Sequence, residues 1–360
     1  MRRFQALAIG GGPAGSALAI QSARLGQSVC LVEGCPDGGF KVGESLPPAL
    51  RPLLRDLGAL PACDAEGALL SYGNRSSWGS ATIADTDFIR DPYGPGWHVD
   101  RPRFDARLRE LAAAAGACVM APCRLRRVTR VAGLDAGWEV VLASADRFET
   151  CRARWIVDCT GRSAWFAQRQ GARRIVYDRL VAVAGVFAAD YPDADSRTLV
   201  ESVAEGWWYS SLVPGGRRMV VFLGDAVRDA VRMRRDPAAF HQRLRRTSHV
   251  GPELHRHGYR LQGQLRVGTA NSARLSHFAG PGWLAAGDAA LSFDPLSSQG
   301  ILTALFGGMQ AAQAIHEGSV ERYSERLAAV FEIYLRNRDL YYAEERRWPD
   351  EPFWRARRPQ

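Results

Sequence analysis

The loop from Gly10 to Gly15, GGGPAG, has the residue types and spacing that bind a phosphate-bearing nucleotide. Glycines allow a tight turn and let backbone approach a pyrophosphate, and the N-terminus of the following helix offers free N–H groups. Glu33 closes the next predicted strand, where its carboxylate can accept hydrogen bonds from ribose hydroxyls and disfavours a 2′-phosphate. The pattern predicts FAD or NAD rather than NADP, with contacts from Gly10, Gly12, Pro13, Ala14, Gly15 and Glu33.

A second stretch, GDAALSFDPLSSQG, joins a predicted buried strand to a predicted helix. Its aspartate, Asp288, can bind a ribityl hydroxyl, and the helix N-terminus near Gly300 can stabilise negative charge on the pyrimidine edge of a flavin. Together with the first loop this favours FAD. The predicted cofactor contacts here are Gly287, Asp288, Pro295, Ser298, Gly300 and Ile301.

Two shorter segments add candidates. Arg101 begins a predicted helix in VDRPRFDARL, where it can reach the flavin or its phosphates or remain a solvated arginine at the helix start. In VDCTG, Gly161 lets the backbone approach the cofactor. Cys159 in the same segment suits a small buried side chain better than a nucleophile.

Lys41, in KVGESLPP, is the only lysine among the 47 basic residues. Its amine can be catalytic, or it can be one more cation beside the cofactor. The segment follows the predicted ribose-binding strand, which favours the cofactor side. Glu44 and Ser45, in the same segment, are also predicted cofactor contacts.

The elements predicted around these residues have an α/β order. FQALAI (4–9) and SVCLVE (28–33) read as strands flanking a helix that stops at Gly26, which is a βαβ start. The alternation from about 174 to 224 predicts a separate antiparallel sheet, with a turn at 214–216. Helices are predicted at 45–60, 102–115, 236–246, 298–316 and 319–345, buried strands at 153–161 and 283–290, and a β-meander from 118 with a turn near 133–137.

The fold class is therefore predicted to be α/β, a Rossmann-like FAD-binding domain with an inserted antiparallel substrate domain and C-terminal helices. FAD-binding parts are predicted at 1–75, 101–173 and 271–318. The remaining parts are substrate-domain strands at 76–100, the antiparallel substrate domain at 174–270, and a C-terminal helix and tail at 319–360.

The composition, 46% hydrophobic and 24% charged, is that of a soluble globular protein. No apolar run approaches the ~20 residues that span a bilayer. The first residues read as a strand rather than a signal peptide, so a cytoplasmic protein with no membrane association is expected. The seven cysteines form no CxxC pair, which favours reduced thiols.

The net charge of +9 comes almost entirely from arginine and can help to hold a phosphate-bearing cofactor or steer an acidic partner. Nucleic acid is not an expected partner, because the basic residues are scattered and no aromatic-basic module stands out. The histidines form no metal set, and His255 and His257 are placed in a loop. No general base is evident, and His98, just before Arg101, is the least implausible acid/base candidate.

In order and spacing, the four segments resemble FAD-dependent monooxygenases with the para-hydroxybenzoate hydroxylase fold, over nearly the whole chain. GESLPP and GDAALSFDPLSSQG are most similar to the branch that holds flavin-dependent tryptophan halogenases and geranylgeranyl reductases. The resemblance implies a large FAD domain with an antiparallel substrate sheet. It also implies that Lys41 is a cation against the flavin, where these families usually carry an arginine.

Halogenases of this branch carry a WxWxIP signature and a catalytic lysine downstream of the GE motif. This chain has GWWYSSLVP (206–214) in place of the signature, and LLSYGNRSSWGS (69–80) holds no lysine. Because a halogenase needs the amine to hold and deliver the hypohalous species, this departure argues against halogenation.

SYGNRSSWGS, GWWYSSLVP and RRWPDEPFWRARR resemble a narrower group, the maturation flavoproteins of enzymes with protein-derived quinone cofactors, of the glycine oxidase and lysine oxidase maturase type. That resemblance implies hydroxylation of a tryptophan or tyrosine in a precursor protein. An indole or phenol needs an aromatic-lined site, which Trp78, Trp207, Trp208 and Tyr209 can supply, although each can equally be packed in a core.

On this reading FAD, reduced by NAD(P)H or by a separate flavin reductase, uses dioxygen to hydroxylate an electron-rich ring, with Pro295, Gly300 and Lys41 nearest the chemistry. The alternatives are a monooxygenase or halogenase of a small aromatic molecule, a geranylgeranyl-type reductase, and a flavin-binding chaperone. The oligomeric state stays open.

Overall fold

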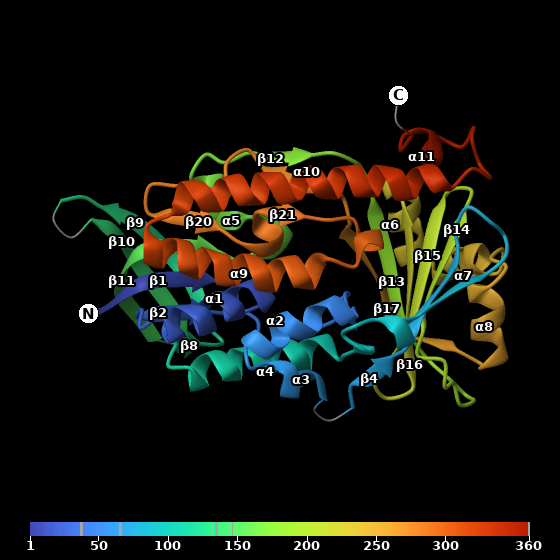
Figure 1. Ribbon diagram of the computed structural model, residues 1–360, viewed down its shortest axis with the longest axis horizontal. Helices are drawn as coiled ribbons and strands as arrows, with labels where there is room; N and C mark the ends of the chain where they lie inside the picture. The colour runs from blue at the N-terminus through green and yellow to red at the C-terminus, as the bar shows by residue number, and fades with distance from the viewer. Residues whose placement is uncertain (37–38, 65–66, 134–135, 146, 359–360) are drawn as a thin grey trace.

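The computed structural model describes residues 1–36, 39–64, 67–133, 136–145 and 147–358. Figure 1 shows an elongated molecule with one sheet and its helices at one end and a second sheet at the other. Two long helices, α9 (Gly300–Glu317) and α10 (Val320–Glu344), lie along its length, and α10 reaches the second sheet. The predicted α/β class is confirmed.

The first sheet carries the parallel core of the fold. Its strands β20, β11, β1, β2 and β8 are neighbours in that order and run parallel, and β9 and β10 continue from β11 as an antiparallel meander. The inner half of β1 and all of β2 are buried, as expected when helices cover both faces. The strands are β1 (Arg2–Ile9), β2 (Val29–Val32), β8 (Cys118–Met120), β9 (Arg124–Val131), β10 (Gly137–Ser144), β11 (Arg147–Asp158), β19 (Ala279–Gly280) and β20 (Trp283–Ala285).

Helix α1 (Pro13–Arg24) packs against α9 with almost no side chain between them. A Cβ at Gly308 of α9 would lie 2.2 Å from the carbonyl oxygen of Ala14, so only glycine permits this approach. The close packing brings the N-termini of both helices to the same end of the first sheet (Figure 1). The remaining helices of this half are α2 (Arg51–Asp56), α3 (Leu60–Asp64), α4 (Arg101–Ala114) and α5 (Trp165–Arg169).

The second sheet has the order β17-β13-β16-β15-β14-β5-β6, antiparallel except for the β14–β5 pair. Side chains alternate between its faces, so Trp208 and Phe222 lie in one core cluster and Trp207 and Tyr209 in another. The strands are β5 (Gly73–Ser77), β6 (Ala84–Asp87), β13 (Val181–Ala188), β14 (Thr198–Val203), β15 (Gly206–Val213), β16 (Arg217–Gly224) and β17 (Arg260–Thr269).

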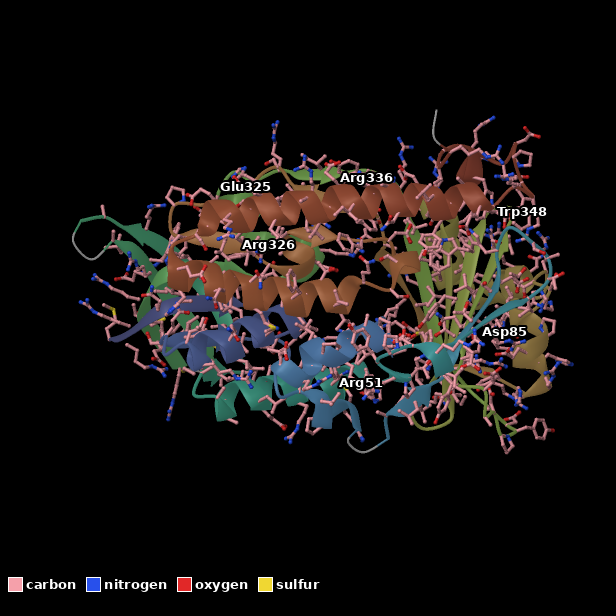
Figure 2. The ribbon with its side chains drawn as sticks, viewed as in Figure 1. Arg51, Asp85, Glu325, Arg326, Arg336 and Trp348 are labelled. Carbon is pink, nitrogen blue, oxygen red and sulfur yellow. The ribbon has the colours of Figure 1, made fainter. Side chains whose placement is uncertain are left out.

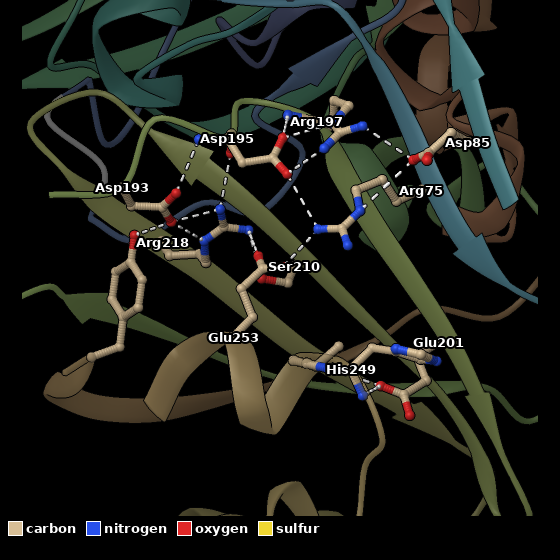
Figure 3. A network of polar contacts seen from close by, with 12 residues as sticks. Arg75, Asp85, Asp193, Asp195, Arg197, Glu201, Ser210, Arg218, His249 and Glu253 are labelled. Carbon is tan, nitrogen blue, oxygen red and sulfur yellow. Dashed lines mark hydrogen bonds and ion pairs between the residues drawn. The ribbon is translucent and has the colours of Figure 1, made fainter. Parts of the chain in front are cut away.

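The outer face of the second sheet is covered by α6 (Val227–Arg235), α7 (Pro237–Leu244) and α8 (Val250–Arg256). An ion network binds α8 to the strands (Figure 3). The fully buried Arg218 pairs with Asp193 (2.7 Å) and with Glu253 of α8 (2.8 Å), and Glu253 also pairs with Arg75 (2.9 Å). Several shared partners offset the cost of burying this guanidinium.

The inner face of the second sheet is closed by the C-terminal segment. Trp348 stacks on Trp354 of α11 (Pro352–Arg355), and Trp354 meets Trp78 edge-to-face. Figure 2 shows Trp348 at the second-sheet end of the molecule. Two small sheets complete the structure: β3 (Ser45–Leu46), β7 (Gly96–His98) and β4 (Leu69–Ser71), and β12 (Arg174–Val176), β18 (Ala273–Leu275) and β21 (Leu291–Ser292).

Several local predictions are wrong in whole or in part. The helix expected over 45–60 is replaced by β3, a 3₁₀ turn at Pro48–Leu50 and the short α2, because Ser45 and Leu46 pair with β7 and Pro47 is extended. His255 lies in α8 rather than in a loop. The buried strand expected over 283–290 ends at Ala285 and is followed by a 3₁₀ turn at Gly287–Ala289, and the residues at 118–120 form β8, which pairs in parallel with β2. The rest of the meander, the helix at 236–246 and the two closing helices are confirmed within a few residues, although 134–135 of the meander turn lie outside the described residues.

No helix among the described residues is long and apolar enough to cross a membrane. The predicted domain boundaries are not tested by these observations and stay a prediction.

Candidate functional site

The glycine loop lies between the end of β1 and the start of α1, as its sequence predicts. Gly10 has φ of +110°, and a Cβ there would lie 2.3 Å from the carbonyl oxygen of Cys159. The carboxylate of Glu33, at the end of β2, accepts hydrogen bonds from the backbone N–H of Gly11 and of Cys35, both 2.7 Å. Glu33 therefore stands beside the loop, in the place where a ribose-binding acid is needed.

Three glycines in this region border open space. A Cβ built on Gly12, Gly161 or Gly300 would meet no atom within 4 Å, although each stands at or next to the start of a helix. No side chain caps the N-terminus of α1 or of α9, so their first N–H groups point to this space. Open glycine backbone and two positive helix ends fit the pyrophosphate and the flavin of FAD.

Arg162, which directly follows Gly161, pairs with Asp288 and so connects these two parts of the site. The Arg162 guanidinium lies 3.5 Å from the Asp288 carboxylate and donates to the carbonyls of Asn271 and Phe293. Burial raises the pKa of Asp288, while Arg162 and Arg174 act to lower it. Sequence reasoning missed Arg162, although its place directly after Gly161 is a usable signal.

The loop before α9 is built around Asp294. Its carboxylate accepts from the N–H of Leu296 (2.9 Å) and from the Tyr342 hydroxyl (2.7 Å). Burial raises the pKa of Asp294 to about 6. Beyond it Pro295, Ser298 and Gly300 are exposed, with Ser298 in the left-handed region at φ of +51°, while Ile301 is buried. These residues present the N-terminus of α9 to the open space described above.

Lys41 is held by a buried carboxylate. Its Nζ lies 2.7 Å from Asp105 of α4, which is 1% exposed and also pairs with Arg101 at 3.3 Å. Arg101 in turn donates to the carbonyl oxygens of Val42 (3.0 Å) and Gly43 (2.9 Å). Lys41 and Arg101 thus brace the segment that leads to Glu44, and Asp105, which the sequence did not single out, connects them.

Glu44 is the hub of a buried polar cluster. Its Oε1 accepts hydrogen bonds from the hydroxyls of Tyr209 (2.7 Å) and Ser211 (2.5 Å), and its Oε2 accepts from the N–H of Gly43 (3.0 Å). The residue is 2% exposed. Tyr209 and Ser211 lie on one face of β15, so Glu44 connects the cofactor half of the molecule to the second sheet. Burial and the nearby Glu44 raise the pKa of Tyr209 well above its usual value.

His98 lies beside this cluster, since β7 pairs His98 with Ser45. The ring is fully buried, its Nε2 is 3.1 Å from the Thr198 hydroxyl, and its Nδ1 has no hydrogen-bond partner among the described residues. Burial lowers the pKa of His98, which keeps the imidazole neutral at neutral pH. The same burial disfavours the imidazolium form, so His98 is a neutral hydrogen-bonding group beside this cluster.

The four aromatic candidates do not share one face. Trp207, Tyr209 and the half-buried Trp78 lie in the cluster that faces the cofactor half, with Phe40 and Leu296 packed against it. Trp208 points the other way and packs on Phe240 of α7, with ring centroids 5.0 Å apart. Strand alternation, visible in the sequence as Trp207-Trp208, is the reason.

Trp207 is connected to the flavin-side loop through α10. Its indole N–H donates to the hydroxyl of Tyr342 (3.1 Å), and that hydroxyl donates to Asp294. Trp207 and Tyr342 are 1% and 2% exposed, so this contact is a packed part of the wall. The half-buried residues around Glu44, namely Phe40, Gly43, Ser45, Tyr209 and Leu296, form the less closed part of the site.

The geometry agrees with comparisons to known proteins. The FAD dependent oxidoreductase family matches residues 6–174. A protein of Marinomonas mediterranea named as the FAD-dependent oxidoreductase LodB is 28% identical over 367 residues, which cover 99% of this chain and 97% of that protein.

Two solved structures have the same fold. The myxobacterial chondrochloren halogenase CndH superposes with a TM-score of 0.86 at 24% identity, over 100% of this chain and 87% of that one. The peptidyl tryptophan dihydroxylase QhpG, described as essential for tryptophylquinone cofactor biogenesis, has a TM-score of 0.80 at 25% identity, over 99% of this chain and 78% of that one.

The site combines a glycine loop, an acid on the ribose side and the open N-termini of α1 and α9. The chain that carries it matches FAD-dependent oxidoreductases by sequence and flavin-dependent halogenases by fold. The chain is an FAD-dependent oxidoreductase of the flavin halogenase-like fold.

Proposed function

We propose that this FAD-dependent oxidoreductase is a monooxygenase that hydroxylates a tryptophan or tyrosine side chain of a partner protein during biogenesis of a quinone cofactor. The observation that carries the proposal is the face of the second sheet turned to the cofactor half. It presents aromatic rings and the buried carboxylate of Glu44, and no amine, because Lys41 is the sole lysine and is paired with Asp105.

The cofactor site divides the work between bound FAD and the chain. FAD, when bound, supplies the reduced flavin that activates dioxygen. The uncapped N-terminus of α9 offers a positive end for negative charge on the flavin, and the Lys41–Asp105–Arg101 group fixes the backbone at 42–43 beside it. Electrons come from NAD(P)H or from a separate flavin reductase.

Glu44 is the proton acceptor on the substrate side. An indole or phenol loses a proton when its ring is hydroxylated, and a carboxylate held within hydrogen-bonding reach can accept it. Tyr209 and Ser211 orient Glu44, and the burial of the cluster keeps bulk water from the reacting ring.

Similarity to QhpG supports a polypeptide substrate, since that enzyme is named for a peptidyl tryptophan. A second candidate is monooxygenation or halogenation of a small aromatic molecule, which the fold similarity to CndH favours. Halogenation needs an amine near the substrate. The one lysine amine of the chain, that of Lys41, is instead paired with Asp105 at 2.7 Å.

Product mass separates the two. The reduced enzyme is supplied with dioxygen, chloride and either free tryptophan or a tryptophan-containing precursor of a quinone-dependent enzyme. The proposal predicts added oxygen on the precursor and no chlorine on either substrate. Chlorinated free tryptophan would favour the second candidate and end the first.

A further inference from the structure

One part of the surface carries an excess of arginine over acidic residues. Residues 225–270 hold ten arginines and four acidic residues, a net charge of +6 out of +9 for the whole chain. The segment contains α6, α7 and α8, which cover the outer face of the second sheet, and β17, its edge strand. Nine of the ten are exposed, namely Arg228, Arg232, Arg234, Arg235, Arg245, Arg246, Arg256, Arg260 and Arg266; we call these nine the arginine face.

Most of the arginine face is free to bind a partner. Among the described residues, Arg260 is the one member with an ion pair, to Asp190 at 2.9 Å; the tenth arginine, the half-buried Arg243, pairs with Asp229. Eight guanidinium groups therefore stand without an intramolecular counter-charge. Like charges gathered in this way repel one another, and an acidic partner would relieve that repulsion.

A hollow in this face gives it a binding shape. A cavity of about 390 Å³ lies between the end of α6 and β17. Arg234, Arg235 and Arg266 stand at its walls, and Pro237 and the buried Leu265 contribute apolar surface. No acidic residue lines it. Cationic walls over an apolar floor concentrate the field on a carboxylate that enters.

The supporting layer is rigid. Glu201 of β14 accepts hydrogen bonds from the first N–H groups of the α8 region, at Ser248 (2.6 Å) and Val250 (2.9 Å). Glu253 of α8 pairs with the buried Arg218 and with Arg75 (Figure 3). A surface fixed in advance loses less conformational entropy when a partner binds.

The residues of the arginine face favour one kind of acidic partner over membranes and nucleic acids. Val227 is the one large apolar side chain of 225–270 that is well exposed, so little can insert into a bilayer. The aromatic rings of Phe240 and Tyr259 are buried, which leaves no platform on which single-stranded bases could stack. An acidic polypeptide needs neither.

We propose that the arginine face binds an acidic stretch of the polypeptide substrate, away from the reacting side chain. The proposal rests on the proposed function for the nature of the partner. Seven members of the arginine face lie in the helical layer 227–256, which covers the face of the second sheet opposite the Glu44 cluster, so docking there and chemistry use separate surfaces. A partner held at the arginine face would reach the site with an extended segment.

Binding of a fluorescein-labelled poly-glutamate peptide to the full-length FAD-loaded enzyme, followed by fluorescence anisotropy, tests this. The variant R234E/R235E/R266E is expected to bind at least about tenfold more weakly, since it reverses three charges around the cavity. R234Q/R235Q/R266Q, which does not place acids at the end of α6, is expected to bind with intermediate affinity. The matched control R126E/R127E/R154E reverses three exposed arginines on β9 and β11, at the opposite end of the molecule in Figure 1, and is expected to bind like the wild type.

Equal loss in the control would show that net charge alone attracts the peptide, and would overturn the proposal. So would tighter binding of duplex DNA, or of phosphatidylserine vesicles, that disappears in R234E/R235E/R266E. The readout needs no catalysis. If the enzyme binds the peptide but hydroxylates no precursor, only the proposed function is contradicted. If R234E/R235E/R266E binds the peptide as the wild type does, only the docking proposal is contradicted.

Discussion

Lys41 shows how far the role of a single residue can be predicted from the sequence. Its uniqueness and its place after the ribose-side strand were enough to predict a cation on the cofactor side, and the structure places it against Asp105 and near Arg101. The partner was not predictable, because Asp105 lies 64 residues away and only the packing of α4 brings it close. Its role toward FAD stays a prediction.

The substitution Lys41→Arg should keep FAD and much of the activity, because a guanidinium can still pair with Asp105. Lys41→Met should weaken FAD binding or slow flavin reduction, since it leaves the buried Asp105 with Arg101 alone. FAD absorbance after gel filtration and stopped-flow reduction measure both effects. If Lys41→Arg retained FAD but lost all turnover, the amine itself would be required and this interpretation would be wrong.

Glu44 was predicted only as a cofactor contact, and its hydrogen bonds to β15 show why sequence could not say more. Tyr209 and Ser211 stand 165 and 167 residues away, and nothing local marks them as its partners. We expect Glu44→Gln to lower kcat about a hundredfold, the scale of a lost general base, with KM and FAD content little changed.

Tyr209→Phe is the matched control, because it removes one donor to Glu44 and leaves the carboxylate. It should lower kcat less than Glu44→Gln does. Loss of FAD or of folding in Glu44→Gln would instead mark Glu44 as a structural link between the two halves, and full activity would exclude it as the base.

The α1 and α9 pair shows what sequence predicts at the scale of elements. The glycine loop and the helix after Gly300 were both recognisable, because each needs particular residues at fixed spacing. The packing of α1 against α9 at Gly308 could not be predicted, because a glycine inside a helix does not indicate which element it contacts. The failed helix over 45–60 has a similar cause: tertiary pairing of β3 with β7 outweighs local helix preference.

Gly308 and Gly300 of α9 should therefore respond differently to alanine. Gly308→Ala places a Cβ 2.2 Å from the Ala14 carbonyl oxygen, and should lower the free energy of unfolding by about 1–3 kcal/mol or more. Gly300→Ala meets no atom within 4 Å and should leave the apo protein within about 0.5 kcal/mol of wild type, yet weaken FAD binding. Denaturant unfolding and FAD titration of both variants provide the check; equal losses of stability would contradict the packing described.

The C-terminal segment shows how the whole molecule is held closed. Sequence predicted a tail but not its place, because the residues that hold it lie far away in the chain: Ser202 and Gly79 contact Glu345 from 143 and 266 residues away. Glu345 accepts hydrogen bonds from Ser202 (2.6 Å), from the N–H of Gly79 (2.8 Å) and from Arg347 (2.7 Å). Burial acts to raise the pKa of Glu345, and hydrogen bonds from Arg347 and Ser202 outweigh it, so that the pKa falls to about 2.

A carboxylate whose pKa is lower in the folded than in the unfolded state stabilises the fold above its unfolded pKa, and this stabilisation is lost as the pH falls toward the folded value. From an ordinary value of 4.5 to about 2, Glu345 should contribute about 3 kcal/mol at neutral pH. Unfolding of wild type and Glu345→Gln at a series of pH values should show a difference that shrinks between about pH 4.5 and 2. A difference independent of pH would contradict this role.

The central claim, hydroxylation of an aromatic residue in a partner protein, is tested most directly with isotopically labelled dioxygen. The reduced enzyme is mixed with the unmodified precursor polypeptide of a quinone-dependent enzyme, and the tryptophan- and tyrosine-containing peptides are analysed by mass spectrometry. The account predicts labelled oxygen on a tryptophan or tyrosine of the precursor, present with the wild type and absent with Gly12→Asp, which fills the open glycine loop. Labelled oxygen on a free small aromatic molecule, with none on the precursor, would contradict it.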